Sequence, residues 1–118
     1  MSIIIPEKGQ SLIIVNSYNI VLVDPNENIE RMLRFYGLPI NSVKAILLTK
    51  ANNLNFFECL MKLKKFSLIA DEETYIEVKK KIKKHFYWSE NMINKRIIPK
   101  VVIQNESNLR ITQKNTNI

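Results

Sequence analysis

Glycine, cysteine and histidine are almost missing from this sequence of 118 residues. Its 2 glycines are too few for a glycine-rich phosphate-binding loop, which excludes a P-loop and a dinucleotide-binding fingerprint. The single cysteine, Cys59, excludes an internal disulfide, and its place in an apolar helical pattern indicates a small buried thiol. The single histidine, His85, falls among lysines, where we expect it to lie at the surface or at the boundary of the core.

Long hydrophobic runs are missing as well. No apolar stretch approaches the roughly 20 residues that a membrane span needs, and Met1–Pro6 lacks the features of a signal peptide. We therefore expect no membrane association, and a location in the cytoplasm or another reducing, soluble compartment such as an organelle stroma. The length predicts a single α/β domain over residues 1–113, followed by a frayed tail over residues 114–118.

Positive charge is abundant and unevenly placed. The formal net charge is +7, and all of this excess lies in residues 62–118, which hold thirteen basic and six acidic residues. The densest basic run is Lys79, Lys80, Lys81, Lys83 and Lys84. Such a cluster is a candidate nucleic-acid-binding surface, and it is also typical of a solvated helix face. Scarce arginine and the absence of an RRM-type glycine–aromatic pattern weaken the nucleic-acid interpretation.

Hydrophobic periodicity predicts strands alternating with helices. The expected strands are Ser2–Ile5, Ser11–Val15, Ile20–Asp24, Val43–Thr49, Ser67–Ala70, Ile97–Gln104 and Leu109–Gln113. The expected helices are Glu27–Tyr36, Phe56–Phe66 and Glu72–Phe86, and Tyr87–Lys95 is expected to be irregular. This order predicts an α/β fold with a mixed sheet, an N-terminal β-hairpin and about three helices.

Polar residues follow the buried strand at Val43–Thr49, where many α/β proteins keep their chemistry. The segment "IVLVDPNENIERMLRFYGLPINSVKAILLTKANNLNFFECLMKL" has Asp24 after one strand, Gly37-Leu38-Pro39 after a helix, and Ala45–Thr49 as the next strand. In this order and spacing it resembles the first half of a metallo-β-lactamase-fold hydrolase, particularly the ribonuclease Z-like branch. The resemblance extends over about residues 11–86 and implies half of an αβ/βα sandwich.

The resemblance also implies a metal-binding motif, T-H-x-H-x-D-H, at the end of that strand. Laid on this motif, the sequence has Lys50, Asn52 and Asn55 at the histidine positions and Leu54 at the aspartate position. Lysine repels a cation at neutral pH, asparagine is a weak zinc ligand and leucine is none. We therefore expect no metal, no cofactor and no catalytic residue of the family type, with Asp24 as a residual acid or a turn residue.

Three functional readings remain open. The first is a catalytically inactive binding or assembly module, a pseudoenzyme that acts through a protein partner or self-association, with RNA processing as a candidate context. The second is a small basic nucleic-acid-binding protein, in which Trp88 beside the lysines either stacks on bases or packs under a loop. The third is a hydrolase that is completed by a second chain, or one that uses Lys50 with Asp24.

A half sandwich would leave one apolar sheet face exposed, and such faces are normally interaction surfaces. Three arrangements would cover it. The strands Ile97–Gln104 and Leu109–Gln113 could fold over it, a second copy of the chain could take the place of the missing half, or a larger partner could bind there.

Overall fold

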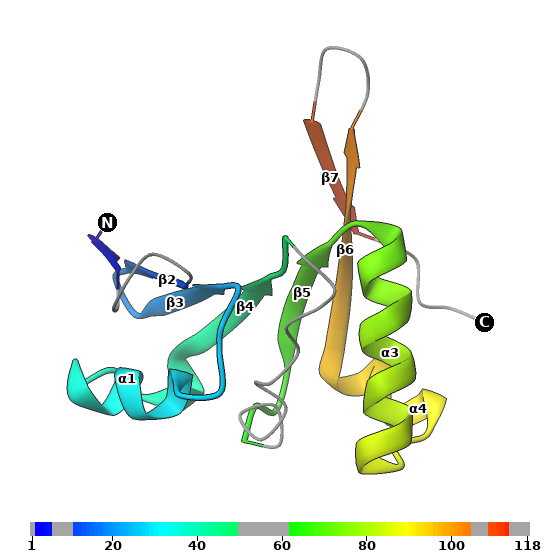
Figure 1. Cartoon of the computed structure of the whole chain (residues 1–118), viewed down its shortest axis with the longest axis horizontal. Coiled ribbons are helices and arrows are strands. Elements are labelled where there is room, and N and C mark those ends of the chain that lie inside the picture. Colours follow the sequence, from blue (N-terminus) through cyan, green and yellow to red (C-terminus); the bar gives the residue numbers. More distant parts are fainter. Residues whose placement is uncertain (1, 6–10, 50–61, 105–108, 114–118) are drawn as a thin grey trace.

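A computed structural model describes residues 2–5, 11–49, 62–104 and 109–113. The described strands form a seven-stranded mixed sheet whose spatial order follows the chain order, β1 to β7 (Figure 1). The strands are β1 (Ser2–Ile4), β2 (Leu12–Asn16), β3 (Asn19–Val23), β4 (Val43–Leu47), β5 (Phe66–Ala70), β6 (Ile97–Gln104) and β7 (Leu109–Gln113). The α-helices are α1 (Ile29–Phe35), α3 (Glu72–Phe86) and α4 (Glu90–Arg96), with a short 3-10 helix, η2 (Ile40–Ser42). The predicted α/β fold class is confirmed.

Strands β3, β4, β5 and β6 are parallel to one another, and the pairs β1–β2, β2–β3 and β6–β7 are antiparallel. The N-terminal hairpin is therefore confirmed. Figure 1 shows that β7 and the end of β6 project beyond the rest of the sheet. Both strands were predicted, and they extend the sheet instead of covering one of its faces. Of the three arrangements considered for the exposed sheet face, the one in which residues 97–104 and 109–113 fold over it is therefore wrong.

The hydrophobic core lies on one face of the sheet. Strand residues Ile13, Leu22, Ile46 and Leu68 are at most 1% exposed and share this face through their register. The helices supply the other side of the same cluster, with the buried residues Ile29, Leu33, Tyr75, Val78, Ile82 and Ile93. All three described α-helices therefore pack on one face, which we call the helix-covered face.

Local sequence signals explain where the helices begin and end. The Asp71 side chain caps α3 by accepting a hydrogen bond from the Thr74 backbone N–H at 2.6 Å, and α3 has the predicted bounds. Gly37 follows α1 at a φ of 68°, where its N–H donates to the Arg34 carbonyl. This left-handed conformation favours glycine and ends the helix as predicted.

The helix predicted over Glu27–Tyr36 is shorter in the structure, where α1 spans Ile29–Phe35. Two other predicted segments differ from the structure in kind. The stretch Tyr87–Lys95 is not irregular throughout, because α4 starts at Glu90 after Ser89 accepts a hydrogen bond from the Met92 N–H. A helix over Phe56–Phe66 is wrong for its last part, since residues 62–65 form a turn and bends and Phe66 begins β5. The rest of that segment, the turn at 105–108 and the tail at 114–118 lie outside the described residues.

Candidate functional site

The carboxyl ends of β3 and β4 meet at Asp24. Its backbone N–H donates to the Leu47 carbonyl at 2.8 Å, which joins the two strand ends. Its carboxylate accepts from the Thr49 backbone N–H at 2.8 Å and from the Thr49 hydroxyl. Its carbonyl accepts from the hydroxyl of the buried Ser11 at 2.7 Å. Asp24 thus links the chain at Ser11 and the ends of β3 and β4 by hydrogen bonds. It does so at the end of the sheet where the sequence predicted a degenerate metal site.

Asp24 holds this position in a left-handed conformation, with a φ of 46°. Such a φ is uncommon for a residue with a Cβ atom, although aspartate tolerates it better than most. The conformation directs the backbone N–H of Asp24 to β4 and its carboxylate to Thr49. The strained geometry therefore accompanies a structural role, in which both carboxylate oxygens accept hydrogen bonds from the chain itself.

The degenerate ligand positions Lys50, Asn52, Leu54 and Asn55 follow Thr49 directly and lie outside the described residues. Within residues 2–5, 11–49, 62–104 and 109–113, no group of three or more His, Cys, Asp or Glu side chains is arranged to hold a metal ion. His85, the single histidine, is exposed on α3. The third reading paired Lys50 with Asp24, and that pairing remains a hypothesis.

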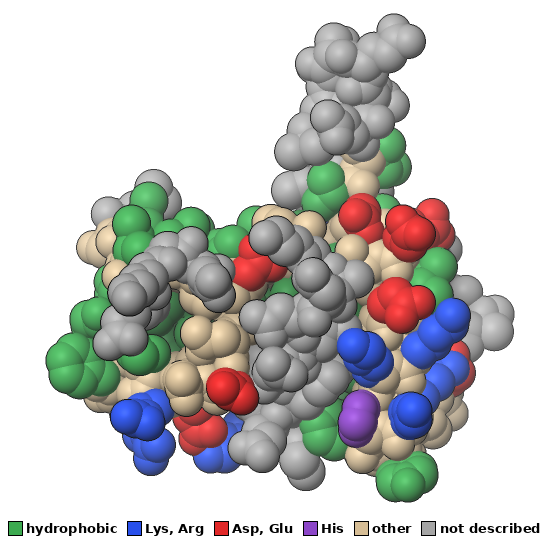
Figure 2. Space-filling model, in the orientation of Figure 1, with side chains coloured by type: hydrophobic (Ala, Val, Ile, Leu, Met, Phe, Trp, Pro, Cys, Tyr) green, Lys and Arg blue, Asp and Glu red, His purple; other side chains and the backbone are tan. Residues whose placement is uncertain are grey.

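The candidate basic surface lies on α3, where Figure 2 shows lysines below a group of acidic side chains. Glu90, at the start of α4, pairs with two of these lysines. It contacts Lys79 Nζ at 2.9 Å and also accepts from Lys83 Nζ. These hydrogen bonds, that to Lys83 first and that to Lys79 second, lower the pKa of Glu90 below its ordinary value.

The remaining lysines of the run differ in their surroundings. Lys80 lies 3.9 Å from a Glu77 carboxylate oxygen one helical turn away, which is a weak surface pair. Lys81 and Lys84 have no ion pair with another described residue. Glu90 and Glu77 therefore offset part of the positive charge of the basic run. The sequence alone did not indicate that Glu90 contacts these lysines.

The aromatic residues after α3 take different roles. Trp88 is 8% exposed and belongs to the core, with its ring 5.6 Å from that of Phe86 between centroids. The guanidinium of Arg96 lies 4.3 Å from the Trp88 ring centroid and also donates to the Leu63 carbonyl. Tyr87 is 89% exposed. Trp88 is thus a packing residue, so the prediction that it packs under a loop describes it better than stacking on bases.

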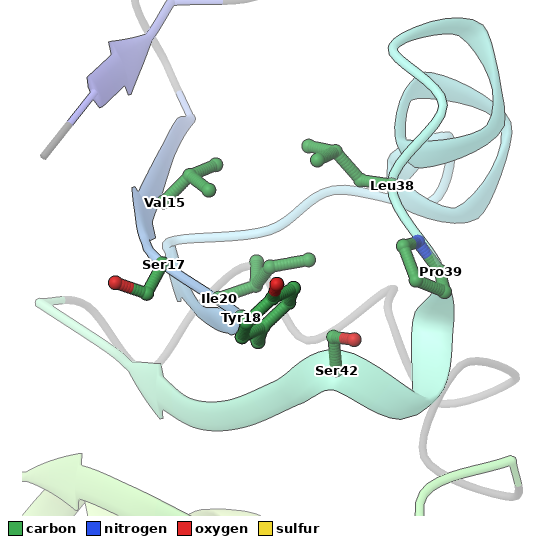
Figure 3. Close-up of a pocket in the computed structure, with 7 residues that line it drawn as sticks. All are labelled: Val15, Ser17, Tyr18, Ile20, Leu38, Pro39 and Ser42. Atoms are coloured by element: carbon green, nitrogen blue, oxygen red, sulfur yellow. The ribbon is translucent and has the colours of Figure 1, made fainter.

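A small open pocket lies at the opposite end of the parallel strands from Asp24. It holds about 180 Å³ between the β2–β3 turn and the stretch that follows α1. Figure 3 shows the side chains that line it, namely Val15, Ser17, Tyr18, Ile20, Leu38, Pro39 and Ser42. Most of these side chains are apolar, and the lining includes no titratable group apart from Tyr18. The pocket offers a hydrophobic contact and no acid–base chemistry.

The fold is of a recognisable class. A mixed sheet with an N-terminal hairpin and helices on one face corresponds to half of a metallo-β-lactamase-type αβ/βα sandwich. The structure is similar to the crystal structure of the short form of human tRNase Z, with a TM-score of 0.53 and 9% sequence identity. The superposition covers 82% of this chain and 48% of that chain, so the chain spans about half of its structural neighbour.

Sequence comparisons give no further relationship, because neither a protein-family model nor a curated protein matches. At such low identity, the likeness to tRNase Z establishes the fold alone. No described helix is long and apolar enough to cross a membrane.

Proposed function

We propose that this chain is a catalytically inactive metallo-β-lactamase-like protein, a pseudoenzyme that works as a binding or assembly module. The observation that carries the proposal is the closed arrangement at Asp24, whose carboxylate oxygens are both engaged by Thr49. The residues that follow are Lys50, Asn52, Leu54 and Asn55, which are poor ligands for a hydrolytic metal ion. A protein with these residues at the ends of β3 and β4 can bind other molecules through its surface without catalysing metal-assisted hydrolysis.

The assembly part of the proposal rests on the second face of the sheet. The described helices all pack on the helix-covered face, and the second face presents half-buried aliphatic side chains such as Val21, Leu47 and Ile69. Water in contact with a continuous apolar surface is unfavourable, and proteins commonly use such surfaces to bind other chains.

RNA processing is the context that we propose for this module. The structural neighbour is a tRNase Z, and the basic run on α3 leaves Lys81 and Lys84 without an ion partner among the described residues. Two such lysines could add weak phosphate contacts to an assembly that forms mainly through apolar surface. A main role as a free-standing nucleic-acid-binding protein has less support, because Glu90 pairs with Lys79 and Lys83 and offsets one of their two positive charges.

Hydrolysis assays test the inactivity directly. We expect no hydrolysis of a small phosphodiester substrate or of a precursor tRNA in the presence of Zn²⁺ or Mn²⁺. Human tRNase Z is the positive control. We also expect no stoichiometric zinc in the purified protein. Turnover that disappears in an Asp24→Asn variant, or one bound zinc per chain, would contradict the proposal.

RNA binding is tested separately by titration of labelled RNA at low salt, where phosphate contacts are strongest. We expect weak binding that a double variant, Lys81→Gln with Lys84→Gln, reduces further. The matched control is Lys95→Gln, which removes an exposed lysine from α4. Tight binding that survives the double variant would place RNA recognition elsewhere on the chain.

A further inference from the structure

The second face of the sheet is aliphatic over at least five neighbouring strands. Strand register places alternate residues of β2, β3, β4, β5 and β6 side by side on this face. Its half-buried aliphatic residues, which we call the open face, include Ile14, Val21, Val23, Leu47, Ile69 and Ile98.

None of these residues belongs to the hydrophobic core cluster or packs at its margin. The buried side chains of α1, α3 and α4 all point to the helix-covered face, so no described helix covers the open face. Sheets buried on one face only normally carry polar residues on the other. Here, valine, isoleucine and leucine occupy the positions that a solvated face would give to polar residues.

We propose that the open face binds the open face of a second copy of this chain, sheet against sheet, in a twofold symmetric dimer. This inference rests on the proposed function and identifies the chain itself as the partner. Two sheets of the same twist pack with their strands nearly aligned, which lets rows of aliphatic side chains interdigitate. In a twofold symmetric dimer, both copies contribute the same surface to the interface, so one self-complementary face is enough.

The distribution of charge favours a second copy over a different partner. Among the described strand residues on this side of the sheet, Lys100 is the charged one, and Asn16, Asn19 and Ser67 add uncharged polar groups. An acidic or basic partner would find little to pair with there. The net charge of +7 would oppose self-association, but the lysines of α3 lie on the other side of the sheet, so two copies can approach through uncharged surface.

The size of the face sets the strength of the dimer. Five strands about 4.8 Å apart and about 16 Å long give a flat footprint of roughly 400 Å². A stable complex usually buries about 800 Å² on each partner. The dimer should therefore dissociate on dilution instead of being permanent.

Sedimentation equilibrium over a range of protein concentrations tests the inference. We expect the mass to rise from monomer toward dimer with concentration, and an Ile69→Lys variant to remain monomeric at least tenfold above the wild-type midpoint. The matched control is Ile76→Lys, which places the same charge on a 43% exposed position of α3 and should dimerise normally. Far-UV circular dichroism shows whether each variant is folded.

A cross-linking measurement keeps the test valid if Ile69→Lys does not fold. Strand β4 is the middle strand of the seven, so a twofold axis that lies between the two sheets and runs along β4 places Leu47 opposite its copy. In a Cys59→Ser background, Leu47→Cys should cross-link to a dimer with a short bismaleimide, and Ile76→Cys should not. Cross-linking should disappear on dilution below the midpoint.

A monomer at every concentration, or a dimer that forms normally with Ile69→Lys and gives no Leu47→Cys cross-link, would overturn the inference. If the chain is monomeric and a different protein binds it through Ile69, the second copy is wrong and the assembly function stands. Metal-dependent hydrolysis would instead contradict the proposed function, whatever the oligomeric state.

Discussion

Asp24 and Thr49 lie 25 residues apart in the sequence, yet the carboxylate of one accepts both the backbone N–H and the hydroxyl of the other. This contact joins the ends of two parallel strands, β3 and β4, and holds the first residue of the predicted degenerate motif. The geometry gives this aspartate a structural role that needs no metal ion, because its carboxylate accepts the Thr49 backbone N–H just beyond the end of β4.

Replacing Asp24 should therefore affect stability. Asp24→Ala removes the acceptors for Thr49 and leaves a Cβ-bearing residue at a φ of 46°, so we expect a loss of about 2–3 kcal/mol in the free energy of unfolding. Asp24→Asn keeps one acceptor and tolerates the left-handed region, so its loss should be about 1 kcal/mol. Urea unfolding measures both, and equal losses would contradict this account.

The ion pairs of Glu90 predict a dependence of stability on pH. Hydrogen bonds from Lys83 and Lys79 lower the pKa of Glu90 in the folded state below its ordinary value of 4.5. The stabilisation is therefore complete above that value and is lost as the pH falls through the lowered folded-state pKa. Glu90→Gln should be less stable than the wild type at pH 7, and the difference should vanish in acid.

The matched control for that prediction is Glu27→Gln, which removes one carboxylate from an exposed position before α1. Thermal unfolding from pH 3 to pH 7 gives the comparison. Added salt should also narrow the difference between wild type and Glu90→Gln, because these pairs are solvent-exposed. A difference that does not shrink at all between pH 7 and pH 3 would show that Glu90 acts through packing and not through its charge.

Arg96 connects α4 to the chain before β5 by stacking on Trp88 and donating to the Leu63 carbonyl. Arg96→Lys loses the planar stacking group, so we expect a destabilisation of about 1 kcal/mol, and about 2 kcal/mol for Arg96→Ala. Trp88 is the only tryptophan, so its fluorescence reports on this contact directly. Emission should shift to the red in Arg96→Ala and stay unchanged in Lys95→Ala, the exposed neighbour.

Tyr87 ends α3 in a left-handed conformation, with a φ of 56°, where most helices would use glycine. Tyr87→Gly should stabilise the protein by about 0.5–1 kcal/mol, because relief of the backbone strain exceeds the entropy that glycine adds to the unfolded chain. Tyr87→Ala retains the Cβ atom and separates the backbone effect from the loss of the exposed ring. Equal stability of these two variants, measured in urea, would contradict the explanation.

Local signals were sufficient for much of the fold. The helix predicted over Glu72–Phe86 has the bounds of α3, and Asp71 with the acidic first turn marks its start, because capping and charge act within one helical turn. The helix α4 was missed since its seven residues are too few for periodicity, although Ser89 and Glu90 do form a helix start. The position of Asp24 was predictable from the strand ending there.

Its contact with Thr49 was not predictable, because a hydrogen bond between distant residues leaves no periodic trace. The same reason hid the pairing of Glu90 with Lys79 and Lys83, which requires α4 to turn back along α3. Sequence patterns thus indicated which residues are chemically suitable for a site. The three-dimensional structure shows which of these residues already form hydrogen bonds or ion pairs with one another.

The strand order of the sheet has a consequence for the way the protein is made. Each strand pairs with the strand that precedes it in the chain, from β1 through β7. During synthesis, a strand that emerges from the ribosome therefore finds its neighbour already available and need not wait for a distant segment. We expect the sheet to grow by addition at one edge, in the direction of translation.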